Sequence, residues 1–437
     1  MSQIKYSPLQ IIFGSFVILV TTICCKTNAP VNSLSDVEGD SVLFQVPSCL
    51  PSCTAADQAA LVANSEFEKT IVTAIESANT SVQFSMYTFS RKPIFEALLA
   101  AAARGVRIQG IMDRAQFKTT AAACKPGGCQ FGAPFSGPDW SAMTISDRRT
   151  RAEIEPIFSG GSNTDKLAVL LFGSLDGSGI RSLPGGDRLV HNKYVLIDGK
   201  TLLSGSGNWS STAVSLNLEN LITYSDTSSP EIVGGIRCSF DLLWAGDPNL
   251  ITQNIAGCQK VDHLYLSPAP SEDRGPRARI LNAIASSSSS IDISMHHLAD
   301  PEVFQALEGA RTRNVAVRMI IDDDDCNAKE DPLFTSLIRS GAKVKYMPTS
   351  CKLFQLSHSK YGIFDDQFVI NGSANWSKAG LKKNYENFVV INSSDSSNAV
   401  GKFRDNFSTL WGLGQEEAAC KCDITSAQCR EQYCISE

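Results

Sequence analysis

One polar pattern occurs twice in the sequence, and this duplication constrains the fold more than any other feature. Both copies read H-x-K-x4-D-x6-G-S-x-N. The first comprises His191, Lys193, Asp198, Gly205, Ser206 and Asn208, and the second comprises His358, Lys360, Asp365, Gly372, Ser373 and Asn375. Every pair is 167 residues apart, as are Glu219 and Glu386 (386 − 219 = 167). Chance agreement at seven positions has a probability on the order of 10⁻⁸, so we predict two similar halves.

Each copy of the pattern predicts a β-hairpin. In the first copy, apolar residues flank the turn-forming pair Asp198-Gly199. A two-residue turn at this pair would place Lys193 opposite Ser204 and His191 opposite Ser206, all on one face. That face would collect an imidazole, an ammonium group and hydroxyls, and the small glycines beside them would allow close approach of the backbone. We interpret it as a binding surface for a phosphate.

The residue types in the pattern suit the cleavage of a phosphodiester. A neutral imidazole can act as a nucleophile near pH 7 and a protonated one as an acid, so His191 and His358 can supply both functions. Lys193 and Lys360 would hold the negative charge of the phosphoryl oxygens as point charges. The amides of Asn208 and Asn375 would add hydrogen-bond donors.

Two pairs of carboxylates accompany the histidines. Glu219 and Glu386 are expected to orient the imidazoles through Nδ1, as carboxylates do at other histidine sites. Asp198 and Asp365 lie where the hairpins turn. We expect a structural role for these aspartates, with a catalytic role as the alternative.

The doubled pattern resembles the phospholipase D superfamily, in which two copies form one active site, and the resemblance covers nearly all of the chain. It implies attack on a phosphodiester by one histidine, a phosphohistidine intermediate, and protonation of the leaving alcohol by the other histidine. Water then releases the phosphate monoester. By the same resemblance, His191 would be the nucleophile and His358 the general acid. The reaction would need no metal and no cofactor.

Outside the pattern, both halves alternate strands and helices. Strands over 82–87 and 106–113 flank a helix over 94–103, and strands over 291–295 and 315–322 flank a helix over 302–310. Short strands over 42–46 and 264–266 open the two halves. We therefore predict an α/β fold with two similar α-β-α sandwich halves, an active site at their interface, and a cysteine-rich C-terminal tail.

The predicted boundaries follow from these elements. They are a leader over 1–25, a linker over 26–41, a first half over 42–246, a second half over 262–413 and a tail over 414–437. Matching strands and helices are 209 residues apart, so the first half contains a net insertion of 209 − 167 = 42 residues before its motif. We place this insertion within 114–187 and expect a lid or rim over the site, with a decorated surface loop as the alternative.

The N-terminus and the cysteines predict export. Residues 8–25 are mostly apolar and read as an export signal, with a permanent anchor as the alternative. Cys24-Cys25 also resembles a relaxed lipoprotein cleavage site. Local disulfides are expected for Cys49 with Cys53, Cys124 with Cys129, Cys238 with Cys258 and Cys326 with Cys351, while Cys420, Cys422, Cys429 and Cys434 crowd the tail. Disulfides are favoured over zinc because no pair has C-x2-C spacing.

Composition narrows the substrate only in part. The chain has 39 Lys and Arg against 45 Asp and Glu, a net charge of −6, and no long basic run, which disfavours a nucleic-acid groove. We expect a monomeric enzyme at a phospholipid or membrane surface that releases phosphatidate and free alcohol, with transphosphatidylation as a further reaction. An exported, metal-independent endonuclease acting on nucleic acid is the alternative, and a catalytically inactive binding protein of the same fold is a remote one.

Two further features are weighed against structural explanations. The run from Asp322 to Asp325 could suggest a divalent metal, but Asp113, which aligns with Asp322, lacks the run, so we expect a solvated loop. His296 and His297 follow a strand whose counterpart in the first half is followed by Tyr87 and Thr88. We therefore expect no direct catalytic role for them, with one of them lining the cleft as the alternative.

Overall fold

The computed structural model describes residues 41–113, 124–125, 128–132, 144–147, 169–170, 178–183, 188–259, 262–269, 271–322, 332–350 and 353–416. These residues lie in one compact unit, Val37–Glu437. The predicted leader, nearly all of the linker, most of the insertion, the run after Asp322, Cys326 and Cys351, and all but the start of the tail lie outside the described residues. The domain boundaries therefore stay predictions.

The first half is built on an eight-stranded sheet in the order β1-β11-β10-β9-β2-β3-β8-β7. Its strands are β1 (Ser41–Gln45), β2 (Ser81–Met86), β3 (Arg107–Met112), β7 (Val169–Leu170), β8 (Gly179–Ser182), β9 (Lys193–Ile197), β10 (Thr201–Gly205) and β11 (Glu219–Ser225). Its helices are α1 (Ala55–Ala63), α2 (Glu66–Ser77), α3 (Lys92–Ala103), α5 (Pro230–Ala245) and α6 (Pro248–Asn254), followed by a short 3₁₀ helix, Ile255–Cys258.

The second half is built on a seven-stranded sheet in the order β12-β18-β17-β16-β13-β14-β15. Its strands are β12 (Leu264–Ser267), β13 (Ser290–Met295), β14 (Ala316–Asp322), β15 (Lys343–Met347), β16 (Lys360–Phe364), β17 (Phe368–Gly372) and β18 (Glu386–Asn392). Its helices are the 3₁₀ turn Glu272–Arg274, α7 (Pro276–Ser286), α8 (Pro301–Thr312), α10 (Pro332–Arg339), α11 (Lys378–Lys382) and α12 (Ser393–Leu413).

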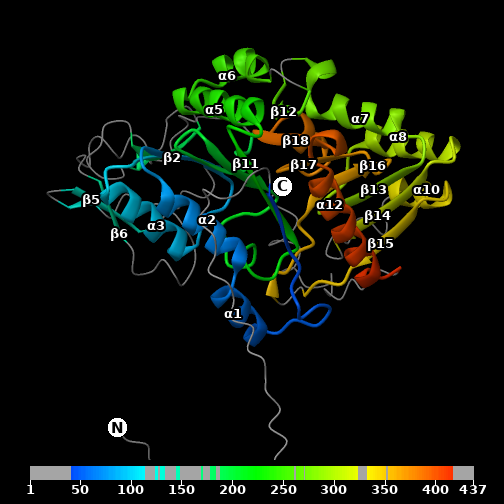
Figure 1. Cartoon of the computed structure of the whole chain (residues 1–437), viewed down its shortest axis with the longest axis horizontal. Coiled ribbons are helices and arrows are strands. Elements are labelled where there is room, and N and C mark those ends of the chain that lie inside the picture. Colours follow the sequence, from blue (N-terminus) through cyan, green and yellow to red (C-terminus); the bar gives the residue numbers. More distant parts are fainter. Residues whose placement is uncertain are drawn as a thin grey trace, which may run out of the picture. The chain divides into compact units, whose positions relative to one another are not determined.

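The seven strands from β1 to β8 in the first order match the seven strands of the second order, and only β7 at the edge has no counterpart among the described residues, so the predicted α/β fold with two similar halves is confirmed (Figure 1). The parallel pair β2 and β3, joined through α3, corresponds to β13 and β14, joined through α8. The antiparallel run β9, β10 and β11 corresponds to β16, β17 and β18. Within the insertion, β4 (Cys124–Lys125), β5 (Gly128–Gly132) and β6 (Thr144–Asp147) form a separate three-stranded sheet. Its relation to the site, as lid or as surface loop, stays a prediction.

Helices form where apolar residues recur at helical spacing. In α2, Phe67, Ile71 and Ile75 are buried on one face, and the Ser65 side chain caps the helix by accepting from the Glu68 N–H. Among the described residues, no helix is both long and apolar enough to cross a membrane. One hydrophobic core contains residues of both halves, including those of α5 and α12. The halves are therefore joined by shared packing.

The hairpin register differs by one residue from the predicted one. Tyr194 pairs with Ser204, and Ile197 pairs with Thr201. The turn itself lies at Asp198-Gly199 as expected, but Lys200 is an extra residue after it, and its carbonyl accepts from the Asp226 N–H at 2.8 Å instead of joining the ladder. This bulge places Gly205, not Ser204, opposite Lys193. The second hairpin has the same register, with Tyr361 opposite Asn371.

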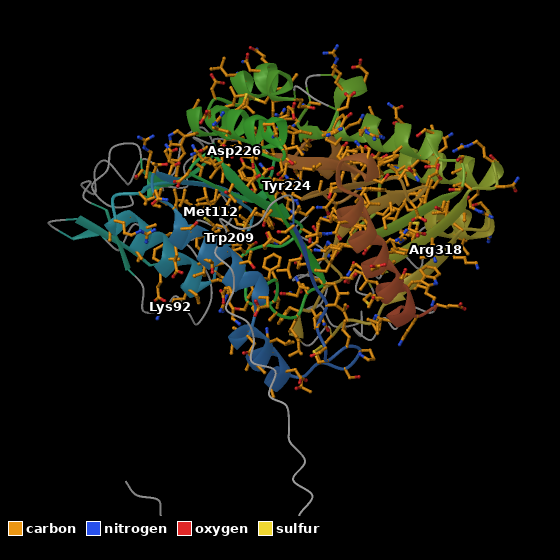
Figure 2. All side chains as sticks on the ribbon, in the orientation of Figure 1. Lys92, Met112, Trp209, Tyr224, Asp226 and Arg318 are labelled. Atoms are coloured by element: carbon orange, nitrogen blue, oxygen red, sulfur yellow. A yellow bond between two sulfur atoms is a disulfide. The ribbon has the colours of Figure 1, made fainter. Side chains whose placement is uncertain are left out.

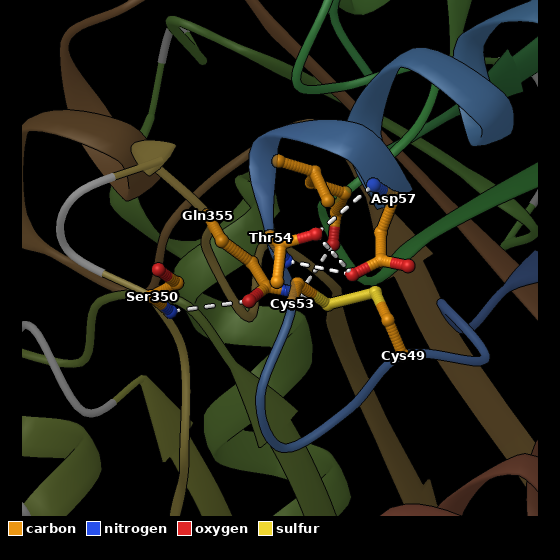
Figure 3. The surroundings of a disulfide bond; sticks show 7 residues. Cys49, Cys53, Thr54, Asp57, Ser350 and Gln355 are labelled. Atoms are coloured by element: carbon orange, nitrogen blue, oxygen red, sulfur yellow. Dashed lines mark hydrogen bonds between the residues drawn. A yellow bond between two sulfur atoms is a disulfide. The ribbon is translucent and has the colours of Figure 1, made fainter.

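The two predicted disulfides whose cysteine side chains are described are confirmed. Cys49 bonds to Cys53, and Cys238 bonds to Cys258. The first bridge precedes α1, where Thr54 and Asp57 form a reciprocal cap. Figure 3 shows Gln355, from the second half, reaching this bridge, with its Nε2 3.5 Å from the Cys53 sulfur and its Oε1 accepting from the Ser350 N–H.

Equivalent positions in the two halves contain interacting pairs of different chemistry. Glu68 and Arg91 form a buried ion pair, with 2.7 Å between Oε1 and Nε. The residues 209 positions later are Arg277 and Asp300, which form a pair of opposite polarity at 2.9 Å. Both halves thus have an ion pair at the same place, but the acidic and the basic residue have exchanged positions.

A second such pair joins neighbouring parallel strands. Gln83 donates to Gln109 in the first half, whereas Arg318 donates to Asp292 at the matching positions of the second. The Arg318 guanidinium, labelled in Figure 2, also lies 5.4 Å from the centre of the Trp411 ring of α12. This residue therefore links the second sheet to a helix of the shared core.

We predict that Arg91→Ala lowers the free energy of unfolding by about 3 to 5 kcal/mol, because it leaves the Glu68 carboxylate buried without its ion-pair partner. Chemical denaturation with a tryptophan-fluorescence readout measures this loss. The double variant Glu68→Arg with Arg91→Asp, which copies the polarity of the second half, should recover most of the stability. A single variant as stable as the wild type would contradict the prediction.

A second prediction concerns the turn aspartates. Burial would raise the pKa of Asp198, but bonds from the consecutive backbone N–H groups of Ser81, Thr80 and Asn79 outweigh it and lower the pKa to about 2. The unfolded value is about 3.9, so this carboxylate stabilises the fold fully above pH 4, and the contribution is lost as the pH falls toward 2. In the second half, burial would likewise raise the pKa of Asp365, but bonds from the backbone N–H groups of Ser290, Ser288 and Ser289 outweigh it and lower the pKa.

Asp198→Asn should therefore lower the denaturation midpoint at pH 7, and its difference from the wild type should shrink between about pH 4 and pH 2. Asp226→Asn, at an exposed carboxylate labelled in Figure 2, is the control and should leave the midpoint unchanged. A difference that stays constant over this range would show that the carboxylate charge is not the cause.

Candidate functional site

The two motif histidines lie immediately before the strands that begin with the motif lysines. β9 begins at Lys193 and β16 at Lys360, each two residues after its histidine. His191 is 2% exposed and His358 is 4% exposed, and both lysines are buried as well. Four ionisable groups are thus shielded from bulk water, and each needs a hydrogen-bond or ion-pair partner.

Backbone hydrogen bonds join the segment before each histidine to the opposite half. The His191 N–H donates to the Tyr385 carbonyl at 3.0 Å, and the His358 N–H donates to the Leu218 carbonyl at 3.0 Å. Leu218 and Tyr385 each directly precede a motif glutamate. These bonds therefore bring the histidine of one half beside the glutamate of the other.

The carboxylate contacts are reciprocal across the interface. The Nδ1 atom of His191 is 2.7 Å from Glu386 Oε1, and the Nδ1 atom of His358 is 2.8 Å from Glu219 Oε1. Both glutamates are 1% exposed. With Nδ1 engaged by a carboxylate, Nε2 is the ring nitrogen left to react, as in other carboxylate-supported histidines.

Each glutamate is held by two polar side chains from its own half. Ser206 Oγ donates to Glu219 Oε2 at 2.6 Å, and Asn217 Nδ2 donates to Oε1 at 3.2 Å. In the second half, Ser373 donates to Glu386 at 2.5 Å and Asn384 at 3.4 Å. The motif serines thus orient the glutamates, whereas the predicted register had placed these hydroxyls on a phosphate-binding face.

The lysines lie close to the same centre. Lys193 Nζ donates to the His191 carbonyl at 2.8 Å, and Lys360 Nζ donates to the His358 carbonyl at 2.7 Å. Burial raises the pKa of Glu219 above its ordinary value, while the charges of Lys360 and Lys193 oppose this rise. Since each motif histidine contacts a glutamate of the opposite half, both motifs belong to a single site.

The aspartates and glycines of the motifs lie outside this centre. Asp198 and Asp365 accept bonds from the backbone at the start of β2 and of β13, a structural arrangement at the hairpin turns. A Cβ atom at Gly205 would collide with the Asn220 carbonyl oxygen, and one at Gly372 would collide with the equivalent carbonyl of Asn387. The glycines thus allow neighbouring strands to approach closely.

The motif asparagines each follow the second strand of their hairpin. The Oδ1 atom of Asn208 accepts from the Thr88 N–H at 3.3 Å, so its amide nitrogen is the end available to donate. Asn375 is 4% exposed at the matching position. Their assignment as donors to a phosphate stays a prediction.

Sequence reasoning missed two buried aspartates that position the motif histidines. Asp113 accepts from the Val190 N–H at 2.9 Å, and Asp322 accepts from the Ser357 N–H. Val190 and Ser357 directly precede the motif histidines. The available signal was the matched position of the two aspartates at the ends of equivalent strands. The expected solvated loop is therefore wrong for Asp322, which is buried at the end of β14, whereas the residues after it lie outside the described ones.

A second missed signal is the tetrapeptide N-x-E-N, present at 217–220 and again at 384–387. Its first asparagine supports the glutamate in each half, as described above. Among the described residues, no group of three or more His, Cys, Asp or Glu side chains is arranged to hold a metal ion.

Aromatic rings flank the motif histidines. The Tyr87 ring lies 5.0 Å from the His191 ring, and the His296 ring lies 4.8 Å from the His358 ring, measured between centroids. His296 thus lies beside the site, as the alternative interpretation proposed. His297 contributes its backbone carbonyl, which accepts from the Trp376 N–H at 3.1 Å.

The reciprocal contacts predict that Glu386→Gln and Glu219→Gln each lower kcat for a chromogenic phosphodiester, such as bis(p-nitrophenyl) phosphate, by roughly 100-fold or more. An amide cannot stabilise an imidazolium or fix its tautomer as a carboxylate does. Steady-state kinetics measures the loss. Glu231→Gln, at an exposed glutamate of α5, is the control and should leave the rate unchanged. Wild-type turnover in either site variant would disprove the role of these carboxylates.

Comparison with known proteins agrees with this geometry. A family model described as cardiolipin synthase, PLD-like domain, matches residues 71–244 and 280–411. The mitochondrial cardiolipin hydrolase of Chlamydomonas reinhardtii is 23% identical over 197 residues, which cover 44% of this chain and 82% of that protein. The phospholipase D of Rickettsia conorii is 29% identical over 132 residues, covering 30% of this chain and 61%, less than two thirds, of that protein.

A solved structure shows the same fold. The phosphatidylserine synthase of Haemophilus influenzae aligns with a TM-score of 0.53 at 12% sequence identity, covering 79% of this chain and 84% of that chain. This likeness concerns architecture alone. The family model, in contrast, matches both halves and more than half of the chain, including both motifs. The protein therefore belongs to the family of phospholipase D-like phosphodiesterases.

Proposed function

We propose that this protein hydrolyses a phospholipid to phosphatidate and a free alcohol through a phosphohistidine intermediate. The observation that supports the proposal most directly is the pair of buried histidines, each held at Nδ1 by a glutamate of the opposite half. Two such histidines at one site provide a nucleophile and an acid for displacement at phosphorus.

In the first step, Nε2 of His191 attacks phosphorus and the bond from phosphorus to the leaving oxygen breaks. His358, protonated at Nε2, gives its proton to that oxygen, and the alcohol leaves. In the second step, water attacks the phosphohistidine, His358 takes a proton from the water, and the bond from phosphorus to His191 breaks. Phosphatidate is released and both histidines return to their starting states.

The surrounding charges suit these steps. The Glu386 carboxylate stabilises the positive charge that His191 gains when it attacks. The Glu219 carboxylate makes the equivalent contact with Nδ1 of His358, which leaves Nε2 of that ring to give its proton to the leaving oxygen. The ammonium groups of Lys193 and Lys360 supply positive charge for the phosphoryl oxygens in the transition state, in a region shielded from water.

A phospholipid is favoured as the substrate for two reasons. Proteins similar to this chain are named cardiolipin hydrolase and phospholipase D. The net charge of −6 also gives no general attraction to nucleic acid. Transphosphatidylation would follow if an alcohol replaced water in the second step.

Export to an oxidising compartment is part of the proposal. The disulfides Cys49–Cys53 and Cys238–Cys258 support it, because such bonds persist in secreted and envelope proteins. Monomeric action at a phospholipid surface, whether as a secreted or a lipid-anchored protein, completes the proposed setting.

The proposal is tested by assaying the purified protein, with chelator present, on phosphatidylcholine, cardiolipin, and single-stranded and duplex DNA. We expect phosphatidate from lipid. His191→Ala should abolish turnover. His358→Ala should accumulate a covalent adduct on the peptide that contains His191 when the substrate has a good leaving group, because that departure needs no acid. Mass spectrometry of a rapidly quenched digest detects the adduct.

His263→Ala is the matched control, since His263 is partly exposed and bonded to Asn392 outside the site. It should retain full activity. Cleavage of DNA without phosphatidate release would replace the lipid substrate by nucleic acid. An adduct found only on the His358 peptide would exchange the two histidine roles. Activity that is lost with chelator and restored by one divalent ion would disprove the metal-independent mechanism.

A further inference from the structure

The two sides of the site differ at the matched positions of Tyr87 and His296. Tyr87 follows β2 directly and His296 follows β13 directly, and 296 − 87 = 209, the separation of these two strands. The register pairs Met86 with Lys193 and Met295 with Lys360. The residue after each methionine therefore lies beside the segment that contains the motif histidine. This position is the same in both halves, although its residue is a tyrosine in one and a histidine in the other.

Both side chains lie beside the motif histidines and are less buried than they are. Tyr87 and His296 are partly exposed, whereas His191 and His358 are buried. The His296 N–H donates to the Ser359 carbonyl at 3.1 Å, which fixes its backbone next to His358. A substrate group that extends beyond the buried histidines would thus meet a phenol on the His191 side and an imidazole on the His358 side.

Under the proposed function, the leaving alcohol departs on the His358 side, because His358 gives it a proton. The ring of His296 is 4.8 Å from that of His358, so His296 is placed to meet the leaving alcohol. Tyr87, 5.0 Å from the ring of His191, belongs to the opposite side, where the phosphatidyl group stays attached.

The chemistry of an imidazole favours one class of leaving alcohol. Histidine changes charge near neutral pH, and an approaching anion stabilises its protonated form. A phosphate on the alcohol would therefore gain a charge-assisted hydrogen bond. A quaternary ammonium group gains nothing from an imidazole that becomes cationic, and it is usually bound by aromatic faces, of which Tyr87 lies on the other side.

Two charged groups in contact with His358 do not cancel such a preference. The Glu219 carboxylate is engaged by His358, and the Lys360 ammonium adds positive charge next to the same histidine. We infer that His296 is a specificity-determining residue that selects phosphodiesters whose leaving alcohol itself contains a phosphate. This inference rests on the proposed function.

The test compares three lipids in mixed detergent micelles at equal mole fraction. Cardiolipin has a phosphate on its leaving alcohol, phosphatidylglycerol has the same glycerol without that phosphate, and phosphatidylcholine has a quaternary ammonium. The wild type should show the highest kcat/KM for cardiolipin. His296→Tyr, which copies the first half, should reduce the ratio of cardiolipin to phosphatidylglycerol activity about tenfold, the loss expected for one charge-assisted hydrogen bond.

Two further variants separate charge from structure. His296→Arg keeps a cationic donor and should retain the cardiolipin preference, whereas His296→Gln keeps a neutral donor and should lose most of it. His263→Gln is the matched histidine control and should match the wild type on all three lipids. Thermal melting verifies that each variant is folded.

The inference is overturned if folded His296→Tyr loses activity equally on all three lipids, or if its cardiolipin preference is unchanged. Wild-type protein that cleaves no diester would instead overturn the proposed function. An oligothymidylate, whose leaving nucleoside also carries a phosphate, forms a separate arm. His296-dependent cleavage of it, without lipid hydrolysis, would support the recognition of phosphate by His296 and assign the substrate to nucleic acid.

Discussion

The site depends on one interaction made twice, the contact of a buried imidazole with a buried carboxylate from the other half of the chain. A buried carboxylate without a partner is costly, and a buried imidazole needs a fixed tautomer to act as a base or an acid. Each half supplies what the other lacks. The serines, the asparagines and the backbone bonds around Leu218 and Tyr385 all serve to hold these two contacts in place. Neither half alone contains a motif histidine together with the glutamate that it contacts.

Much of the fold could be predicted from the sequence because the repeat provides two versions of most strands and helices. The alternation of strands and helices around Met86 recurs around Met295, and two independent copies support the same interpretation. The hairpin register could not be predicted, because the extra residue Lys200 donates its N–H to the Ile197 carbonyl while its own carbonyl accepts from Asp226, which is distant in sequence. The types of the site residues could likewise be predicted from the sequence. Their pairing across the interface was not, because sequence spacing does not distinguish a glutamate that serves its own half from one that serves the other.

The halves have kept their geometry more strictly than their chemistry. The glutamine pair of β2 and β3 is an aspartate–arginine pair in β13 and β14, and the phenol beside one motif histidine is an imidazole beside the other. The hydrogen-bonding around the two glutamates, in contrast, is the same in both halves. The residues that hold the two glutamates are thus matched, and some of the residues beside them differ between the halves.

The opposite polarity of the two buried ion pairs has a consequence for how the chain assembles. Two similar halves on one polypeptide could exchange helices while folding, since α2 and α7 pack at equivalent places. If α2 docked on the second half, Glu68 would face Asp300, and if α7 docked on the first, Arg277 would face Arg91. Either exchange would bury two like charges together without a counterion. The inverted polarity therefore favours the pairing of α2 with the start of α3 and of α7 with the start of α8 over either exchanged pairing.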